Sequence, residues 1–157
     1  MPSSVAHALT AVALGTVLYP AERTRRLYAL AAACAVLVDL DAVGRPFGRG
    51  DVVWLGGHRA LTHSLAFAAL LAAAVVAAAY RGPEGRGRRL GLWAYLALAT
   101  AAHGALDALT TYGEGVMFLA PFSEARFKSP WRPFHRIVPE MVGVWLPAAL
   151  VIWYRRR

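Results

Sequence analysis

Long apolar blocks rich in alanine are the feature that most constrains how this chain can fold. One of them, LAFAALLAAAVVAAAY at residues 65–80, has no polar face for water. Hydrophobic residues make up 58% of the 157 residues and the mean hydropathy is +0.44. Soluble domains are usually about 45–50% apolar. The sequence therefore predicts a membrane protein, with residues 1–157 forming one domain.

Five blocks have the composition of helices, at about 4–19, 24–38, 60–80, 90–111 and 140–154. The third and fourth are long enough to cross a hydrocarbon core of roughly 30 Å. The other three are short, so they have to tilt, thin the bilayer or insert only in part. We expect an all-α fold, an integral membrane bundle of about five helices.

The basic residues predict an orientation for this bundle. If all five blocks span, one side receives ten basic residues in compact clusters, and the other receives seven in longer loops. The positive-inside rule then places the C-terminal YRRR in the cytoplasm and the N-terminus outside, in the cell (inner) membrane. The net charge of +8 is explained by this topology, because the arginines form no single basic face for nucleic acid.

Histidines and carboxylates gather at the outer ends of the predicted helices. In AAHGALDALTT, His103 and Asp107 are four residues apart and share one helix face. His7 lies on a weaker polar stripe of the first block, and Asp39 and Asp41 end the second. The motif HRALTHS is expected to place one histidine in a loop and the next in the first turn of the third helix. Its two histidines are His58 and His63.

A shared metal site explains why such groups meet at one depth. Ionisable groups in a membrane helix are expensive and are functional candidates by default. Asp39, Asp41 and Asp107 with a bridging hydroxide would balance two divalent ions if the four histidines are neutral ligands. Mixed imidazole and carboxylate ligands suit zinc, with manganese or iron as alternatives. Each group also has a plainer interpretation, as a core histidine, an ion pair with arginine or a hydrogen-bonded pair.

The motifs PSSVAH, DLD, HRALTHS, HGALDALTTYG and PFS resemble the YdjM-like family, described as LexA-regulated, membrane-bound metal-dependent hydrolases. The resemblance runs from residue 2 to about 127. The family is similar to zinc-dependent phospholipases C and zinc nucleases, which are all-helical. This implies metal-ligand roles for a set of seven residues: His7, Asp39, Asp41, His58, His63, His103 and Asp107. It also implies a phosphoester substrate.

The expected activity is metal-assisted hydrolysis, in which two or more metal ions activate a bridging water. Asp107 and Arg59 are the candidate catalytic residues. The guanidinium of Arg59 suits a phosphate oxygen, although a structural pairing with Asp41 or Asp51 is an equal alternative. The aromatic and basic segment at residues 112–135 favours membrane lipids and a lipid or lipid-linked substrate as partners.

Two other functions use the same residues. A metal or proton transporter would need polar groups along the whole path, and the inner halves of the third and fourth blocks offer almost none. A non-catalytic membrane protein with a structural metal is the other alternative. An open coordination position would argue against it, because structural sites are normally closed.

Overall fold

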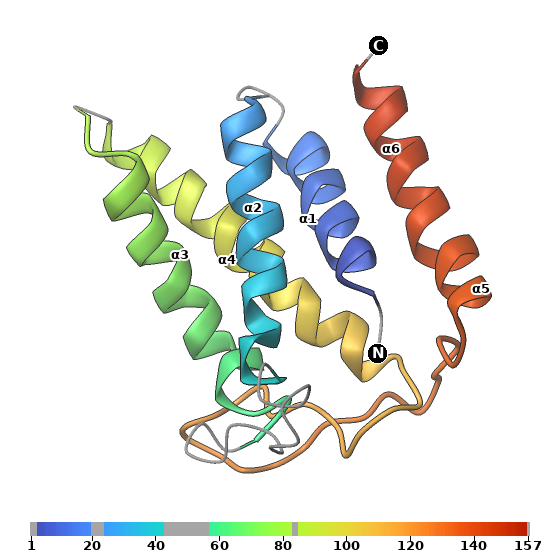
Figure 1. Ribbon diagram of the computed structural model, residues 1–157. Coiled ribbons are helices and arrows are strands. Elements are labelled where there is room, and N and C mark those ends of the chain that lie inside the picture. The colour runs from blue at the N-terminus through green and yellow to red at the C-terminus, as the bar shows by residue number, and fades with distance from the viewer. Residues whose placement is uncertain (1–2, 20–23, 43–56, 83–84, 157) are drawn as a thin grey trace.

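The computed structural model describes residues 3–19, 24–42, 57–82 and 85–156, and these form an all-α bundle (Figure 1). The α-helices are α1 (Ser4–Leu18), α2 (Arg25–Leu37), α3 (Leu65–Ala79), α4 (Arg86–Ala108), α5 (Ile137–Glu140) and α6 (Leu146–Arg156). Short 3-10 helices η1 (Val38–Ala42) and η4 (Leu61–His63) extend α2 and precede α3, and a π-helical turn, η5 (Met141–Trp145), joins α5 to α6. Within the described ranges two isolated bridges occur but no β-strand, so the all-α part of the predicted fold is confirmed.

Hydroxyl side chains fix where three of these helices begin. Ser3, Thr24 and Ser64 each accept a hydrogen bond from a backbone N–H in the first turn of α1, α2 and α3. Such N-caps satisfy donors that would otherwise have no partner. Because Ser64 is the cap, α3 starts at Leu65. The expectation that His63 lies in the first turn of this helix is therefore wrong, and His63 ends the preceding 3-10 turn.

Small residues let the first four helices pack closely. The main apolar core joins α1, α2, α3 and α4, and alanines supply much of it. Gly15 of α1 faces the ring of Tyr95 on α4, where an added Cβ would lie 2.3 Å from the hydroxyl oxygen. That hydroxyl donates to the carbonyl of Ala11 at 2.9 Å. Close approach of α1 and α4 therefore depends on a residue without a side chain.

The last helical stretch is the one described segment with the length and hydropathy to cross a membrane. It runs over Ile137–Arg155 and packs along α1. Helices α1 and α3 are apolar but have 15 residues each, and α4 begins with three arginines. The expectation that the third and fourth blocks are the long apolar spans is therefore not met. The predicted integral bundle has one candidate span by this criterion.

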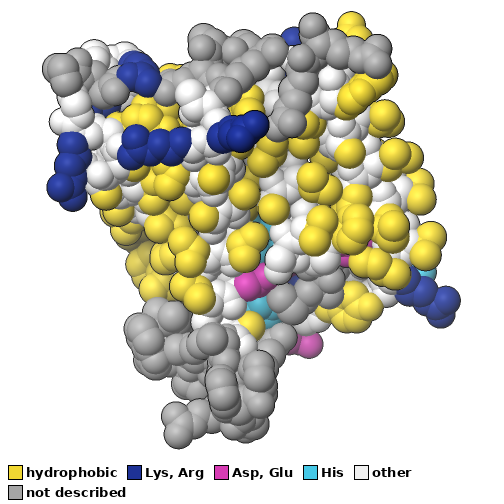
Figure 2. All heavy atoms as spheres, turned by 45° about the horizontal axis from the view of Figure 1, so that its top comes forward, with side chains coloured by type: hydrophobic (Ala, Val, Ile, Leu, Met, Phe, Trp, Pro, Cys, Tyr) yellow, Lys and Arg dark blue, Asp and Glu magenta, His cyan; other side chains and the backbone are white. Residues whose placement is uncertain are grey.

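The two ends of the bundle differ in character. The N-terminus, the 3-10 turns and the long connection from α4 to α5 lie at one end, and the C-terminus lies at the other (Figure 1). Hydrophobic side chains cover much of the face in Figure 2, with lysine and arginine side chains gathered mostly toward its upper end. Some of the charged residues between the predicted helices and at the C-terminus lie outside the described residues, namely Glu22, Arg23, Arg45, Arg49, Asp51, Glu84 and Arg157.

Candidate metal centre

Segments far apart in the sequence bring their histidines and carboxylates together at one end of the bundle. His7 comes from α1, the two aspartates from η1, and two histidines from the HRALTHS segment; His103 and Asp107 come from α4. Gly104 allows α4 to approach that segment, because an added Cβ would lie 3.2 Å from the carbonyl oxygen of His63. The structure thus places all seven predicted ligands in one region.

Four of these residues form a group that we call the central group: Asp39, His63, His103 and Asp107. Asp39 Oδ1 lies 3.3 Å from Nε2 of His103 and 3.7 Å from Nε2 of His63. Asp107 Oδ2 lies 3.4 Å from His63 Nε2 and 3.9 Å from His103 Nε2. One potential ligand atom from each residue lies within 4.8 Å of the others. This arrangement can accommodate a cation at its centre.

His7 lies beside the central group. Its ring stacks on that of His103 with centroids 3.6 Å apart, and its Nε2 is 3.7 Å from Oδ1 of Asp107. Neither ring nitrogen of His7 has a hydrogen-bond partner, although the residue is only 1% exposed. Since an unpaired buried polar group is costly, His7 has the properties expected of an additional ligand.

Asp41 belongs to a second group with His58 and His63, directly adjacent to the first. Its Oδ1 lies 2.8 Å from Nδ1 of His58, and its Oδ2 accepts from the hydroxyl of Thr62 at 2.7 Å. Burial alone would raise the pKa of Asp41, but hydrogen bonds from His58, His63 and Thr62 outweigh it and lower the pKa. Asp41 is therefore an ionised carboxylate despite being fully buried.

Buried atoms without hydrogen-bond partners test whether these residues fit a metal. The orphaned atoms are Nε2 of all four histidines, Nδ1 of His7, Oδ1 of Asp39 and both carboxylate oxygens of Asp107. Native proteins leave few such atoms unsatisfied, and those that occur call for an explanation. Imidazole nitrogen and carboxylate oxygen are the donors that zinc and related divalent metals prefer. The residues fit a metal site.

The backbone also orients one ligand. His103 Nδ1 lies 2.6 Å from the carbonyl oxygen of Ala35 on α2, and because a carbonyl only accepts, this nitrogen carries the proton. Nε2 of His103 then presents its lone pair to the central group. Metal-binding histidines usually have such a partner on the second nitrogen. This contact has no sequence signature, because it involves a main-chain atom of an alanine.

Arg59 is buried and bonded within the protein. Its Nε lies 2.8 Å from Oδ2 of Asp107, one terminal nitrogen donates to the hydroxyl of Thr110 at 3.1 Å, and the other donates to the carbonyl of Tyr112. Its side chain is 2% exposed. This geometry favours the structural alternative over phosphate binding. The carboxylate that the guanidinium contacts is Asp107 and not Asp41, and Asp51 lies outside the described residues.

Glu140 and Thr62 have roles that the sequence did not specify. Glu140 is buried at the end of α5. There its carboxylate accepts from the backbone N–H of Ser3 at 2.8 Å and from the indole of Trp145 at 2.9 Å. Thr62 was expected only to help fix a turn. A motif spacing reveals neither contact, since both depend on tertiary packing.

The fold and this region define a class of protein: helical bundles that carry a buried His/Asp cluster able to hold a metal ion. The chain belongs to the YdjM inner membrane protein family, whose model matches residues 1–157. It is 33% identical to the inner membrane protein YbcI of Escherichia coli (strain K12), over the full length of both chains. No solved structure matches it significantly.

Proposed function

We propose that this chain is an integral membrane, metal-dependent hydrolase that acts on phosphoester bonds of a lipid or lipid-linked substrate. The observation that carries the proposal is the set of orphaned imidazole and carboxylate atoms facing one another at the central group. Membership of an inner membrane protein family supports the location. We further propose that the N-terminus and the site face outward and the C-terminus faces the cytoplasm.

Charge balance supports at least one divalent ion. Asp39, Asp41 and Asp107 carry three negative charges, and the buried guanidinium of Arg59 offsets one of them. Two negative charges then remain if the histidines are neutral. Burying uncompensated charge costs several kcal/mol per ion, and a divalent cation bound among these carboxylates would offset it. Zinc is the proposed ion, and the expected minimum is one equivalent, not two.

The residues of the central group would hold the metal, with His7 beside them. A divalent metal bound there lowers the pKa of a coordinated water toward neutrality and so supplies a hydroxide nucleophile. Arg59 keeps Asp107 oriented through its bond to one carboxylate oxygen. The side chain of Asp39 is 20% exposed, whereas those of His63 and His103 are fully buried. This open edge supports access for substrate and argues against a closed structural site.

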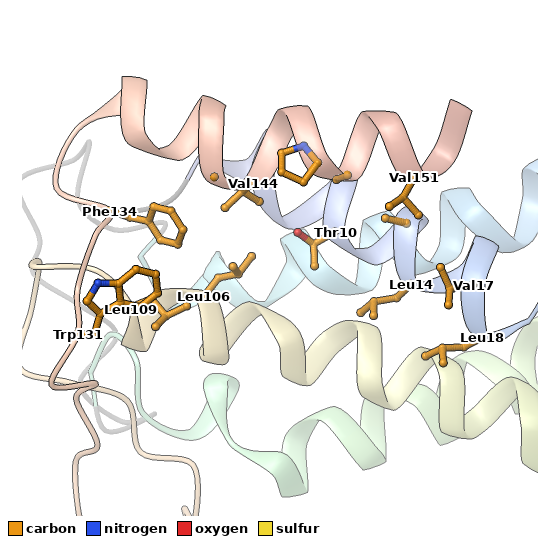
Figure 3. A pocket seen from close by; sticks show the side chains of 14 residues that line it. Thr10, Leu14, Val17, Leu18, Leu106, Leu109, Trp131, Phe134, Val144 and Val151 are labelled. Carbon is orange, nitrogen blue, oxygen red and sulfur yellow. The ribbon is translucent and has the colours of Figure 1, made fainter. Parts of the chain in front are cut away.

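An apolar pocket of about 530 Å³ supports a lipid substrate. It lies between α1, α4 and α6, and Figure 3 shows Leu14, Leu106 and Val151 pointing into it from these three helices. Thr10 supplies the only hydroxyl of its lining. One end of the pocket is level with the site, because Leu106 adjoins Asp107 in the chain. Hydrocarbon suits such a lining.

The segment that follows α4 also supports contact with lipid. Phe122 is 88% exposed and Trp131 is 68% exposed, at the end of the bundle that carries the site. Exposed rings of this kind are typical of the membrane–water interface. The body of the bundle beyond the site is filled by the apolar core of α1 to α4. Within the described residues the polar groups of this core are a few tyrosine and threonine hydroxyls and no ionised side chain, which counts against a transporter.

Metal analysis of the purified protein in detergent tests the proposal. We expect at least one equivalent of zinc or a similar metal in the wild type, and loss of most of it in Asp107→Ala and in Asp39→Asn. Glu114→Gln is the control, because it alters an exposed carboxylate that pairs with Lys128 and belongs to neither group of the site. Unchanged metal content in both site variants would refute the metal centre.

Substrate class is tested by filling the pocket. Leu14→Trp is expected to lower hydrolysis of a long-chain phospholipid by about tenfold or more while leaving a short, water-soluble phosphodiester unaffected, since only the long chain needs the pocket. The control is Leu70→Trp, at an α3 position that is 71% exposed and outside the pocket. Equal losses with both substrates would contradict a hydrocarbon-binding role.

A further inference from the structure

The hydroxyl of Thr62 lies between a carboxylate and a histidine of the candidate metal centre. Its Oγ1 is 2.7 Å from Oδ2 of Asp41 and 3.1 Å from Nδ1 of His63. Thr62 is 5% exposed, and Asp41 is fully buried. Water therefore does not compete for these bonds, and their direction is set by the donors and acceptors present.

The number of hydrogens that each group carries determines which group donates in these two hydrogen bonds. An ionised carboxylate only accepts, and a threonine hydroxyl has one hydrogen and two lone pairs. The hydroxyl hydrogen of Thr62 therefore goes to Asp41, and its oxygen is left to accept from Nδ1 of His63. His63 thus carries its proton on Nδ1. Its Nε2, which has no hydrogen-bond partner, is left with a lone pair that faces the central group.

The same carboxylate fixes a second histidine directly. Oδ1 of Asp41 lies 2.8 Å from Nδ1 of His58, which must be the donor, and Nε2 of His58 is buried without a partner. Oδ2 of Asp41 also accepts from the backbone N–H of Arg59 at 3.2 Å. Both oxygens of Asp41 are therefore engaged by protein donors, unlike those of Asp107, which are orphaned apart from the contact with Arg59.

We propose that Asp41 is a positioning residue and not a metal ligand. It holds the proton of His58 on Nδ1 directly. It holds that of His63 through Thr62, supported by a longer contact of 3.3 Å between its own Oδ2 and Nδ1 of His63. This differs from the ligand role that the family resemblance implies for Asp41. The inference rests on the proposed function in one respect, namely that the freed Nε2 atoms receive a metal. The hydrogen-bond relay itself exists with or without metal, so the two can be tested apart.

Three threonine variants test the relay through metal affinity. In detergent-purified protein, zinc competition against a chelator should show binding about 10–100-fold weaker in Thr62→Val, the usual effect of losing such an orienting partner. Thr62→Ser keeps the hydroxyl and should stay within about threefold of the wild type. The control is Thr16→Val, because Thr16 is 1% exposed and its hydroxyl bonds only the carbonyl of Ala13.

A spectroscopic measurement reads the proton position directly. Protein labelled with ¹⁵N at histidine, without metal and in alkaline buffer where the imidazoles are neutral, should show the proton of His63 on Nδ1 in the wild type. In Thr62→Val the Nδ1 form should lose population, because only the 3.3 Å contact between Nδ1 and Oδ2 of Asp41 remains to favour it. A packing defect alone would not move this signal between the two nitrogens. The measurement needs no metal, so it decides the relay even if the protein binds none.

The outcomes separate the two proposals. Weaker zinc binding in Thr62→Val with rescue in Thr62→Ser, together with the Nδ1 proton in the wild type, supports the relay. Wild-type affinity in Thr62→Val, equal losses in the valine and serine variants, or a proton on Nε2 of His63 overturns it. Absence of bound zinc in the wild type would instead refute the proposed metal function while leaving the proton measurement to judge the relay.

Discussion

Arg59 links the two acidic parts of the site through two different atoms of one residue. Its backbone N–H donates to Asp41, and its side-chain Nε contacts Asp107 at 2.8 Å. The residue adopts φ = 64°, in the left-handed region that residues other than glycine rarely occupy. Its carbonyl accepts from the backbone N–H of Met117 at 2.9 Å, which helps to hold this conformation. The backbone of Arg59 therefore contacts Asp41 while its side chain contacts Asp107, so this one residue helps to set the distance between the two carboxylates.

Removing this guanidinium should be costly. Arg59→Met leaves the carboxylate of Asp107 buried without its cation, and breaking a buried pair from one side typically costs about 3–5 kcal/mol. We expect a decrease of that size in the free energy of unfolding, measured in detergent without added metal. Arg59→Lys keeps the charge but cannot contact Asp107, Thr110 and Tyr112 together. Its free energy of unfolding should therefore lie between those of the wild type and Arg59→Met. A loss below about 1 kcal/mol in Arg59→Met would contradict this role.

Sequence reasoning at this scale identified which residues would meet, but not how each is used. The spacing of His103 and Asp107 placed them on one helix face, and the structure agrees. The direct contact of Asp41 with His58, and the carbonyl of Ala35 as partner of His103, have no sequence signature. They depend on which atoms tertiary packing brings within hydrogen-bond distance, and periodicity does not encode that.

At the scale of helices, α1 and α4 are held together at the level of Gly15. An added Cβ there would lie 2.3 Å from the hydroxyl oxygen and 2.6 Å from Cζ of Tyr95. The ring cannot simply swing away, since its hydroxyl bonds α1 at the carbonyl of Ala11 and the residue is 3% exposed. This crossing helps to align α1 and α4, and His7 and Asp107 lie on these two helices.

Gly15→Ala is therefore expected to destabilise the bundle by about 1–3 kcal/mol, the usual cost of overpacking a core. Gly87→Ala in the first turn of α4 is the matched control. A Cβ there meets nothing within 4 Å, so this change should be neutral or stabilising by up to about 1 kcal/mol. Thermal unfolding of both variants in the same detergent would show the difference. Equal stability of the two would mean that α1 and α4 can separate without penalty.

Helix existence was predictable from the apolar blocks, whereas helix ends depended on single residues. Residues 60–80 look like one helix because the apolar run begins close to the histidines. Ser64 interrupts it, since its hydroxyl caps α3 and leaves the three residues before it as a 3-10 turn. The final stretch was expected to start at 140 and begins at Ile137 instead, which gives it enough apolar length to be the candidate span.

For the whole molecule, the separation of the two ends allows a direct test of orientation. Phe122 is exposed at the end that carries the site, and Tyr154, 73% exposed, lies near the C-terminus at the other. With the lone, buried Cys34 replaced by alanine, Phe122→Cys in intact spheroplasts should react with an impermeant maleimide. Tyr154→Cys should react only after permeabilisation. The reverse pattern would invert the proposed topology.

The contact between Ser3 and Glu140 joins parts of the chain 137 residues apart. Ser3 also caps α1, the helix that places His7 beside the central group. Glu140 is synthesised long after Ser3 and α1, because it follows Ser3 by 137 residues. The anchor of α1 is therefore complete only once the last helical stretch has been synthesised and can contact Ser3. An incomplete chain would contain every candidate ligand but would lack the contact that fixes the start of α1.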